Sequence, residues 1–351
     1  MINNKCFQKD WILNLRQSRF PKTAPQLIEK TIYAFEMLGL VTQSGKDFVF
    51  KGGTSLMLSI PDFDRFSIDI DIIGQFSESE LNQRIRNSVF LRVEENVRKA
   101  SDIPKQHFKF TYTSIFGKEE SVLLDVLNEK VPYKILKSVQ IQTDLFEVVE
   151  NLNVQIPVID EILGDKLTAF APHTIGIQYG IDKDTEIIKQ LFDIGRLFDH
   201  ISDINLLIDA YQTISRQENL YRNNRFSSSE ILKDTFQAGI KLCNIDLKGF
   251  VEDDETIALR NGIKTVGGYL FRGRLPFETA KIYAAKASLL ANIILINQKD
   301  FDIQQLLYSP VKMQHFEDKM LPEEFGRLQR LKKINPECFY YLYQLSTLLI
   351  R

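Results

Sequence analysis

The sequence predicts an α+β fold, with a small mixed sheet in the N-terminal part and a helical C-terminal part. Two observations lead to this class. Over residues 1–130, short strand-like apolar runs alternate with helical patterns, whereas the segments beyond residue 160 carry helical periodicity. We expect the boundary near Pro157, with one domain over residues 1–156 and a helical domain over residues 157–351.

The composition fits a globular protein with at least two domains. The 351 residues are 44% hydrophobic and 26% charged, with a net charge of -2, so no global basic footprint points to nucleic acid. The three cysteines are far apart and form no C-x-x-C pair, which indicates buried thiols in a reducing compartment. Neither a secretory leader nor a run of about 18 apolar residues is seen. We therefore expect a cytoplasmic protein that does not enter the membrane.

The first elements of the N-terminal domain are a helix and two strands. Residues 22–40 place apolar side chains at helical spacing, and Gly39 is suited to end the helix. "DFVFKGG", residues 47–53, predicts a short strand that ends in a turn. "FSIDIDII", residues 66–73, predicts a second strand, because apolar and polar residues alternate in it.

A second helix and a second pair of strands follow. Residues 77–101 predict a long amphipathic helix, with Ser77 or Ser79 as its N-cap. "HFKFTYTSI", residues 107–115, and "ESVLLDVLNE", residues 120–129, predict two strands joined by a glycine turn. These elements together make an α/β unit with a small mixed sheet.

The C-terminal domain is predicted from helical periodicity alone. Residues 217–229, "QENLYRNNRFSSS", are the best candidate for an exposed loop within it. The helical segments are residues 160–171, 184–201, 203–217, 276–298, 322–334 and 336–350.

Two adjacent glycines follow the first predicted strand. Gly52 and Gly53 let the backbone approach a ligand closely, and their N–H groups can bind phosphate oxygens. The hydroxyl group of Thr54 or Ser55 can donate to the same phosphate, and a helix that starts there adds its dipole. The turn therefore predicts a phosphate site.

Two aspartates interrupt the second apolar strand. Asp69 and Asp71 are two residues apart, so both side chains lie on one face, with Cα atoms roughly 6 to 7 Å apart. Two carboxylates this close suit Mg²⁺, which takes few protein ligands and keeps phosphate oxygens as others. Asp125, in "SVLLDVL", is the candidate third carboxylate of a site for two metal ions. The four histidines lack metal-ligand spacing, so we expect ordinary surface or core roles for His107, His173, His200 and His315.

The order of these motifs resembles the polymerase β-like nucleotidyltransferase superfamily. More specifically, "KGGTSL" and "RFSIDID" resemble the AbiEii/AbiGii toxin family, whose motif reads K-G-G-T-x-L followed by R-x-S-x-D-x-D. The family pattern continues with a helical lysine, here Lys166, and a lone helical aspartate, here Asp193. The resemblance implies that Asp69 and Asp71 bind metal and take part in catalysis. It also implies that Lys166 neutralises phosphate charge and that Asp193 is a further acidic active-site residue. The nucleotide-binding residues that it implies are Lys51, Gly52, Gly53, Thr54, Ser55, Arg65 and Ser67.

The sequence departs from the family at one point, and several residues could instead be structural. Family members often carry a basic–acidic pair before the last aspartate, where this chain has Lys189 and Gln190. Asp193 could also be a partner of Arg196, three residues on. Three other site residues also have a structural alternative: Asp125 could be a sheet-edge charge, Lys166 a surface lysine, and Arg65 a solvated loop residue. The basic residues Arg327, Arg330, Lys332 and Lys333 could form a solvated helix face or contact RNA.

The predicted function is metal-dependent transfer of a nucleoside monophosphate from a nucleoside triphosphate to an acceptor hydroxyl group, with pyrophosphate leaving. We expect two Mg²⁺ ions and a helical domain that completes the active site. The resemblance implies a toxin of a toxin–antitoxin or abortive-infection pair, with an antitoxin protein as partner and RNA, at the 3′ end of tRNA, as acceptor. Two further functions are compatible with the residues: transfer to a protein hydroxyl or to Ser67 itself, and nucleotide binding by a regulator without turnover.

Overall fold

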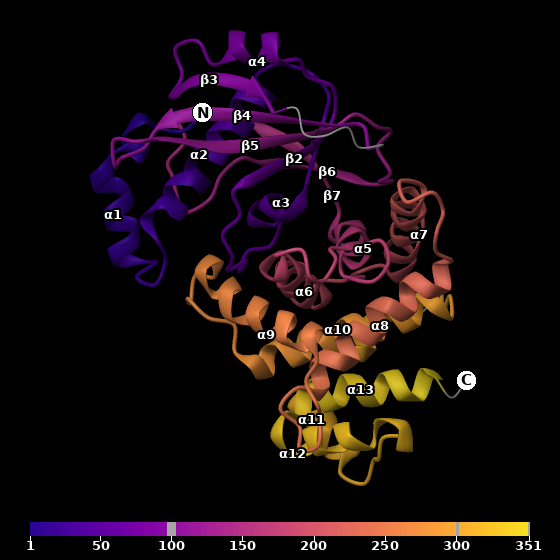
Figure 1. Cartoon of the computed structure of the whole chain (residues 1–351). Helices are drawn as coiled ribbons and strands as arrows, with labels where there is room; N and C mark the ends of the chain where they lie inside the picture. The colour runs from indigo at the N-terminus through magenta and orange to yellow at the C-terminus, as the bar shows by residue number, and fades with distance from the viewer. Residues whose placement is uncertain (97–102, 300–301, 350–351) are drawn as a thin grey trace. The chain divides into compact units, whose positions relative to one another are not determined.

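The computed structural model describes residues 1–96, 103–299 and 302–349, and the chain divides into two compact units (Figure 1). The first unit comprises Met1–Val158 together with Gly268–Gly273, and the second comprises Ile159–Gly267 and Arg274–Arg351. Among the described residues, no helix combines the length and the apolar character that a membrane crossing requires.

The first unit is built on one seven-stranded sheet in the order β3-β4-β5-β2-β1-β7-β6. The sheet is mixed, because β2 runs parallel to β5 and β1 runs parallel to β7, while the other neighbouring strands are antiparallel. The predicted α+β class and mixed sheet are therefore confirmed. The strands are β1 Val49–Lys51, β2 Asp69–Ile73, β3 Phe90–Glu95, β4 Lys105–Thr113, β5 Glu119–Leu127, β6 Leu136–Gln140 and β7 Asn153–Pro157.

One face of this sheet is apolar and buried. Ile70 and Ile72 of β2 are at most 1% exposed, and Leu124 and Val126 of β5 and Phe108 of β4 beside them are fully buried. Helix α2 packs on β2 and β5 (Figure 1). Successive strand residues point to opposite faces, so the charged residues between these apolar ones share the other face, called here the open face. The helices of this unit are α1 Lys9–Ser18, α2 Pro25–Thr42, α3 Gly52–Ser59 and α4 Glu78–Arg84.

The predicted long helix over residues 77–101 is wrong beyond its first two turns. Helix α4 does begin at the predicted cap, where Ser77 and Glu80 form a capping box, but it ends at Arg84. Strand β3 follows at Phe90–Glu95, and residues 97–101 of the predicted helix lie outside the described residues. The second predicted strand is also shorter than expected, because β2 starts at Asp69 rather than at residue 66.

The second unit is helical, as predicted. Helix α10 packs against α6, α8 and α13, and α5 packs against α6 and α7. All three cysteines of the chain are free and buried, in agreement with the sequence. The predicted loop over residues 217–229 is shorter than expected, because helix α7 continues to Leu220 and helix α8 begins at Ser228. Residue 350 of the last predicted helix lies outside the described part. The α-helices are α5 Ile159–Ala169, α6 Asp184–Phe198, α7 Ile204–Leu220, α8 Ser228–Asn244, α9 Asp254–Val266, α10 Phe277–Leu295, α11 Pro310–Met313, α12 Leu331–Ile334 and α13 Pro336–Leu349.

Candidate active site

A row of four charged or titratable residues crosses the open face of the sheet. The strand register pairs Lys51 with Asp71, Asp71 with Asp125, and Asp125 with His107. Directly paired residues of neighbouring strands place their side chains on the same face. Asp69 precedes Asp71 by two residues on β2, so its side chain shares that face. The register therefore brings the three predicted carboxylates to the same side of the sheet.

The ammonium group of Lys105 lies between two of these carboxylates. Its Nζ is 2.7 Å from Asp125 Oδ2 and 3.8 Å from Asp71 Oδ1. Burial opposes the charge on Lys105, but the two carboxylates outweigh it and raise the lysine's pKa. Lys105 is a residue of this face that the sequence analysis missed.

The carboxylate of Asp125 is held on both sides. Lys105 contacts one oxygen, and His107 Nδ1 lies 2.6 Å from the other. Burial alone would raise the pKa of Asp125, but the nearby Lys105 and His107 lower it below its ordinary value. His107, expected to be an ordinary histidine, is thus part of the row. The alternation in "KQHFKF" is the sequence signal that could have found both residues.

The two glycines bring the start of helix α3 against Asp71. Gly52 has a φ of +80°, and a Cβ built there would collide with the Asp71 carboxylate. A Cβ on Gly53 would lie 2.5 Å from Arg65 Nη2 and 3.2 Å from Ser67 Oγ. The structure therefore brings the diglycine turn together with Asp71, Arg65 and Ser67. The first N–H groups of α3 have no acceptor within the helix, which suits an anionic ligand.

The hydroxyl groups after the glycines brace the backbone. Thr54 Oγ1 donates to the carbonyl oxygen of Asp69 at 2.6 Å, and Ser55 Oγ donates to that of Gly52 at 2.8 Å. Both side chains are buried. The first bond ties helix α3 to the strand end that carries Asp69. The predicted phosphate contact of Thr54 and Ser55 stays a prediction.

A distant segment of the chain holds the loop that carries Arg65. Residues 268–273 return to the first unit, where Phe66 N donates to Tyr269 O at 2.8 Å and Phe271 N donates to Asp64 O at 2.9 Å. Arg65 is 3% exposed, and its Nη1 donates to Phe66 O at 3.0 Å. Arg65 is thus a fixed residue rather than a solvated one.

Lys166 and Asp193 form a buried ion pair within the second unit. Lys166 Nζ, on α5, lies 2.9 Å from Asp193 Oδ2, on α6, and donates to Gln190 Oε1 at 3.2 Å. The Asp193 side chain is fully buried, and Lys166 is 8% exposed. Lys166 is therefore not a solvated surface lysine. Gln190, where the sequence departs from the family, contacts the predicted catalytic lysine directly. The catalytic roles of this pair stay predictions.

Two carboxylates of the open face suit a hard cation bound together with phosphate oxygens. Within residues 1–96, 103–299 and 302–349, no group of three or more His, Cys, Asp or Glu side chains is arranged to hold a metal ion. The two carboxylates of Asp69 and Asp71 match the one or two that Mg²⁺ takes from protein when a nucleotide supplies other oxygens. The space that a Cβ on Gly52 would fill lies against one of them. These two residues therefore fit Mg²⁺ bound to a nucleotide.

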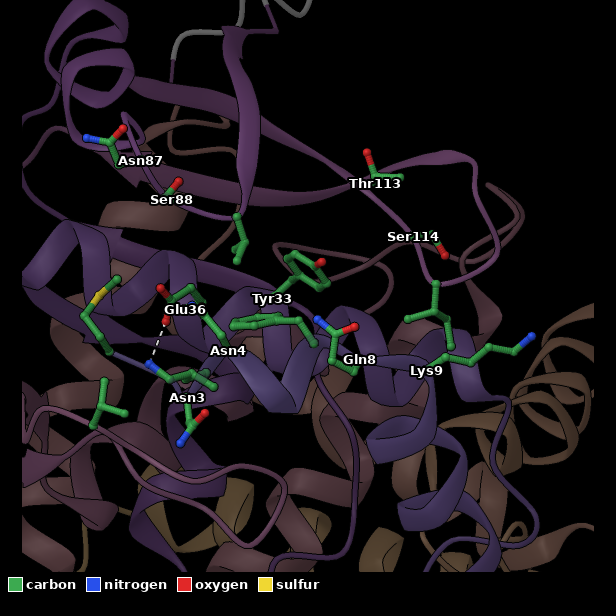
Figure 2. A pocket seen from close by; sticks show the side chains of 16 residues that line it. Asn3, Asn4, Gln8, Lys9, Tyr33, Glu36, Asn87, Ser88, Thr113 and Ser114 are labelled. Carbon is green, nitrogen blue, oxygen red and sulfur yellow. Dashed lines mark hydrogen bonds between the residues drawn. The ribbon is translucent and has the colours of Figure 1, made fainter.

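A cavity of about 930 Å³ lies elsewhere in the first unit (Figure 2). Its walls come from the N-terminal segment, from α2 and from the residues before β3 and after β4. Tyr33 and Glu36 point into it in Figure 2, where Glu36 Oε2 accepts from Ile2 N at 2.8 Å. None of the predicted site residues is among the described residues that line it. The cavity is therefore separate from the carboxylate row.

Comparison with known proteins identifies the family of this chain. A family model described as "Nucleotidyl transferase AbiEii toxin, Type IV TA system" matches residues 40–264, which is more than half of the chain and includes every predicted site residue. No curated protein matches the sequence. Among solved structures, an antigenic nucleotidyltransferase-like protein from Paracoccidioides brasiliensis matches with 13% identity and a TM-score of 0.36, over 58% of this chain and 92% of that one. The family match confirms the predicted resemblance: this chain belongs to the AbiEii nucleotidyl transferase toxin family of type IV toxin–antitoxin systems, and it is a nucleotidyltransferase.

Proposed function

We propose that this nucleotidyltransferase requires a divalent metal ion and transfers a nucleoside monophosphate from a nucleoside triphosphate to a hydroxyl group of RNA, at the 3′ end of tRNA. The observation that carries the proposal is the contact between the diglycine turn and Asp71. A turn suited to phosphate and a carboxylate suited to a cation meet at one point, which supports binding of a metal–nucleotide complex. The family supports the reaction class, and the tRNA acceptor rests on the resemblance.

Asp69 and Asp71 would hold the Mg²⁺, which on binding withdraws charge from the phosphate oxygens. The N–H groups of Gly52 and Gly53 would bind the triphosphate, and Lys51 and Arg65 would add positive charge beside it. The acceptor oxygen attacks the α-phosphorus in line, a new P–O bond forms, and the hydroxyl proton passes to solvent. The bond from the α-phosphorus to the oxygen that bridges to the β-phosphate breaks, so pyrophosphate leaves. The sequence also predicts a second ion at Asp125, a carboxylate that Lys105 holds in this structure.

The two residues of the buried pair have proposed roles in the same reaction. Lys166 would neutralise phosphate charge, as the resemblance implies, and Asp193 would orient that lysine through their 2.9 Å contact. The proposal extends to the setting of the reaction: a cytoplasmic toxin whose activity a cognate antitoxin protein restrains. The family's place in type IV toxin–antitoxin systems supports such a partner.

The test is a labelling experiment with the purified chain. Total cellular RNA is incubated with each labelled nucleoside triphosphate in turn, with and without Mg²⁺. We expect label in the tRNA fraction with at least one nucleotide, in the presence of Mg²⁺ only, and none with Asp69→Asn or Asp71→Asn. Asp144→Asn is the matched control, because that aspartate is exposed and pairs with Arg19 at the surface. Label without Mg²⁺, or label retained by the two site variants, would contradict the proposal.

A second acceptor is favoured by one observation. Ser67 Oγ lies 3.2 Å from the position of a Cβ on Gly53, so a hydroxyl group of the chain itself is beside the predicted phosphate site. Transfer to Ser67, or to a hydroxyl group of another protein, would label protein rather than RNA. Ser67→Ala then separates the cases: label lost from the chain points to self-modification, and label kept on RNA supports the main proposal. Nucleotide binding with no transfer to any pool would instead indicate a regulator.

A further inference from the structure

Lys105 stands where a second metal ion would have to bind. Asp71 and Asp125 are paired across β2 and β5, and the Lys105 ammonium contacts both of them, at 3.8 Å and 2.7 Å. An ammonium group between two carboxylates neutralises them as a cation would. The lysine comes from the first residue of β4, a strand inside the sheet, so the fold itself delivers this charge.

The carboxylate of Asp125 is occupied at both oxygens. Lys105 contacts Oδ2, and His107 Nδ1 lies 2.6 Å from Oδ1. A Mg²⁺ ion on Oδ2, at about 2.1 Å, would lie within about 5 Å of the ammonium, where two like charges repel strongly. Lys105 lies farther from Asp71, at 3.8 Å from its Oδ1, and His107 pairs with Asp125 rather than with Asp71. The described residues also contain no three-carboxylate group arranged around one point.

We propose that Lys105 serves as the resident cation at the second-ion position, so that the chain binds one divalent ion, at Asp69 and Asp71, rather than two. This inference rests on the proposed metal-dependent function. Asp125 is then a positioning residue: it holds Lys105 and His107 instead of coordinating metal. The two-ion arrangement expected from the sequence is replaced by one metal ion and one ammonium group.

The test counts Mn²⁺ ions bound to the full chain, by electron paramagnetic resonance of the free ion, with and without a non-hydrolysable nucleoside triphosphate analogue. We expect one Mn²⁺ per chain in the complex, the ion that Asp69 and Asp71 share with the bound analogue, after the Mn²⁺ held by free analogue is subtracted. Lys105→Met removes the ammonium and gains a second ion, whereas Lys105→Arg keeps the positive charge and stays at one. Lys109→Met is the matched control, because Lys109 lies on the same face of β4 but pairs with Leu123, and it stays at one.

Asp125→Asn keeps the inference testable if Lys105→Met does not fold. Because Asp125 binds no metal in this scheme, the variant still binds one Mn²⁺, with an affinity within about twofold of the wild type. Two ions on the wild-type chain, no second ion on folded Lys105→Met, or a loss of more than tenfold in Mn²⁺ affinity in Asp125→Asn would each overturn it. Nucleotide transfer is assayed in parallel: transfer by a wild-type chain with two ions refutes only this inference, whereas a single bound ion without any transfer refutes only the proposed function.

Discussion

Two buried environments in the first unit treat a carboxylate in opposite ways. On the open face, Asp125 is partly buried, yet its pKa is lowered, because Lys105 and His107 outweigh the burial. On α2, the helix that packs on the apolar face, Glu29 is fully buried and its pKa is raised, because burial outweighs its hydrogen bonds. Those bonds come from neutral donors, the Ser114 hydroxyl at 2.8 Å and the Ile115 N–H at 2.7 Å.

The difference shows what distinguishes a site from a structural acid. Burial alone favours the neutral carboxyl group, and hydrogen bonds from neutral donors do not reverse that preference at Glu29. Positive side chains do reverse it at Asp125. The open face is therefore arranged to keep the Asp125 carboxylate ionised. The buried glutamate serves the packing of α2 against the turn between β4 and β5.

The largest expected effect is a loss of catalysis when a carboxylate on the open face is replaced by an amide. Asp71→Asn removes a proposed metal ligand, so we expect transfer to fall by about 10³-fold, equivalent to about 4 kcal/mol of transition-state stabilisation. Glu29→Gln also changes a carboxyl group to an amide, but on helix α2, and is expected to keep transfer within about twofold. Initial rates of label incorporation check both, with circular dichroism as the control for folding. Equal losses in the two variants would remove the distinction between the environments.

The next effect is on stability, from the two lysine–aspartate pairs. Lys166→Met takes the ammonium away from a fully buried carboxylate, Asp193, so we expect a loss of about 3 to 5 kcal/mol in the free energy of unfolding. Lys105→Met acts on side chains that are 33% and 15% exposed, where water screens the charges, and is expected to lose about 1 kcal/mol or less. Urea denaturation measures both. A loss for Lys105→Met as large as that for Lys166→Met would mean that the open-face pair is structural.

A smaller effect separates the glycine turn of the site from an ordinary glycine turn. Gly52 and Gly45 both have positive φ, +80° and +72°, but a Cβ on Gly45 meets nothing within 4 Å. Gly45→Ala is therefore expected to lose only the conformational term, about 1 kcal/mol. Gly52→Ala adds the collision with Asp71, about 1 to 3 kcal/mol more, and lowers transfer by at least about tenfold. Denaturation and transfer rates are compared for the two variants; matching behaviour would contradict the close approach of the turn to Asp71.

The smallest effect is a dependence of stability on pH. The folded pKa of Glu29 lies above its ordinary value of 4.5. Just above pH 4.5, the folded chain keeps a proton that the unfolded chain has released. The free energy of unfolding therefore falls as pH rises, by at most about 1.4 kcal/mol per pH unit, and levels off above the folded pKa. Glu29→Gln has no titrating carboxyl group at this position, so its stability relative to the wild type rises between pH 4.5 and the folded pKa of Glu29. Thermal unfolding between pH 4 and pH 7 measures the trend.

Asp125→Asn should give the reverse trend. Its folded pKa lies below the ordinary value of 3.8, so the ionised group stabilises the fold above that value, and the stabilisation is lost as pH falls through the folded pKa. The deficit of this variant therefore shrinks in acid. A parallel pH trend in the two variants would show that the cations do not control Asp125.

Much of the site could be predicted from local sequence. Period-2 alternation placed Asp69 and Asp71 on one face of a strand, and the adjacent glycines marked a turn of special geometry, because these properties depend only on neighbouring residues. The same alternation was present at Lys105 and His107. A lysine or histidine on a strand has no distinctive meaning until its neighbour across the sheet is known, so this alternation alone does not identify a site.

Local pattern failed where pairing between strands decides the structure. Phe90 and Val93 are three residues apart, a spacing that suits a helix, but both are buried in β3 because the register shifts between Phe90 and Arg92. A bulge of this kind changes the period of burial within a strand. The half-exposed strand β6 and its partner β7 likewise carried too weak a pattern to be predicted.

The sequence by itself determined the fold class, the family motif and the two aspartates on one face of a strand, since each of these depends on residues that lie close together along the chain. Only the tertiary structure decided which charges meet those carboxylates. Lys105 reaches Asp71, which lies 34 residues earlier in the sequence, through the register of the sheet. Residues 268–273 return from far along the chain to hold the loop of Arg65. Such contacts depend on how the whole chain packs, and no short window of sequence contains that information.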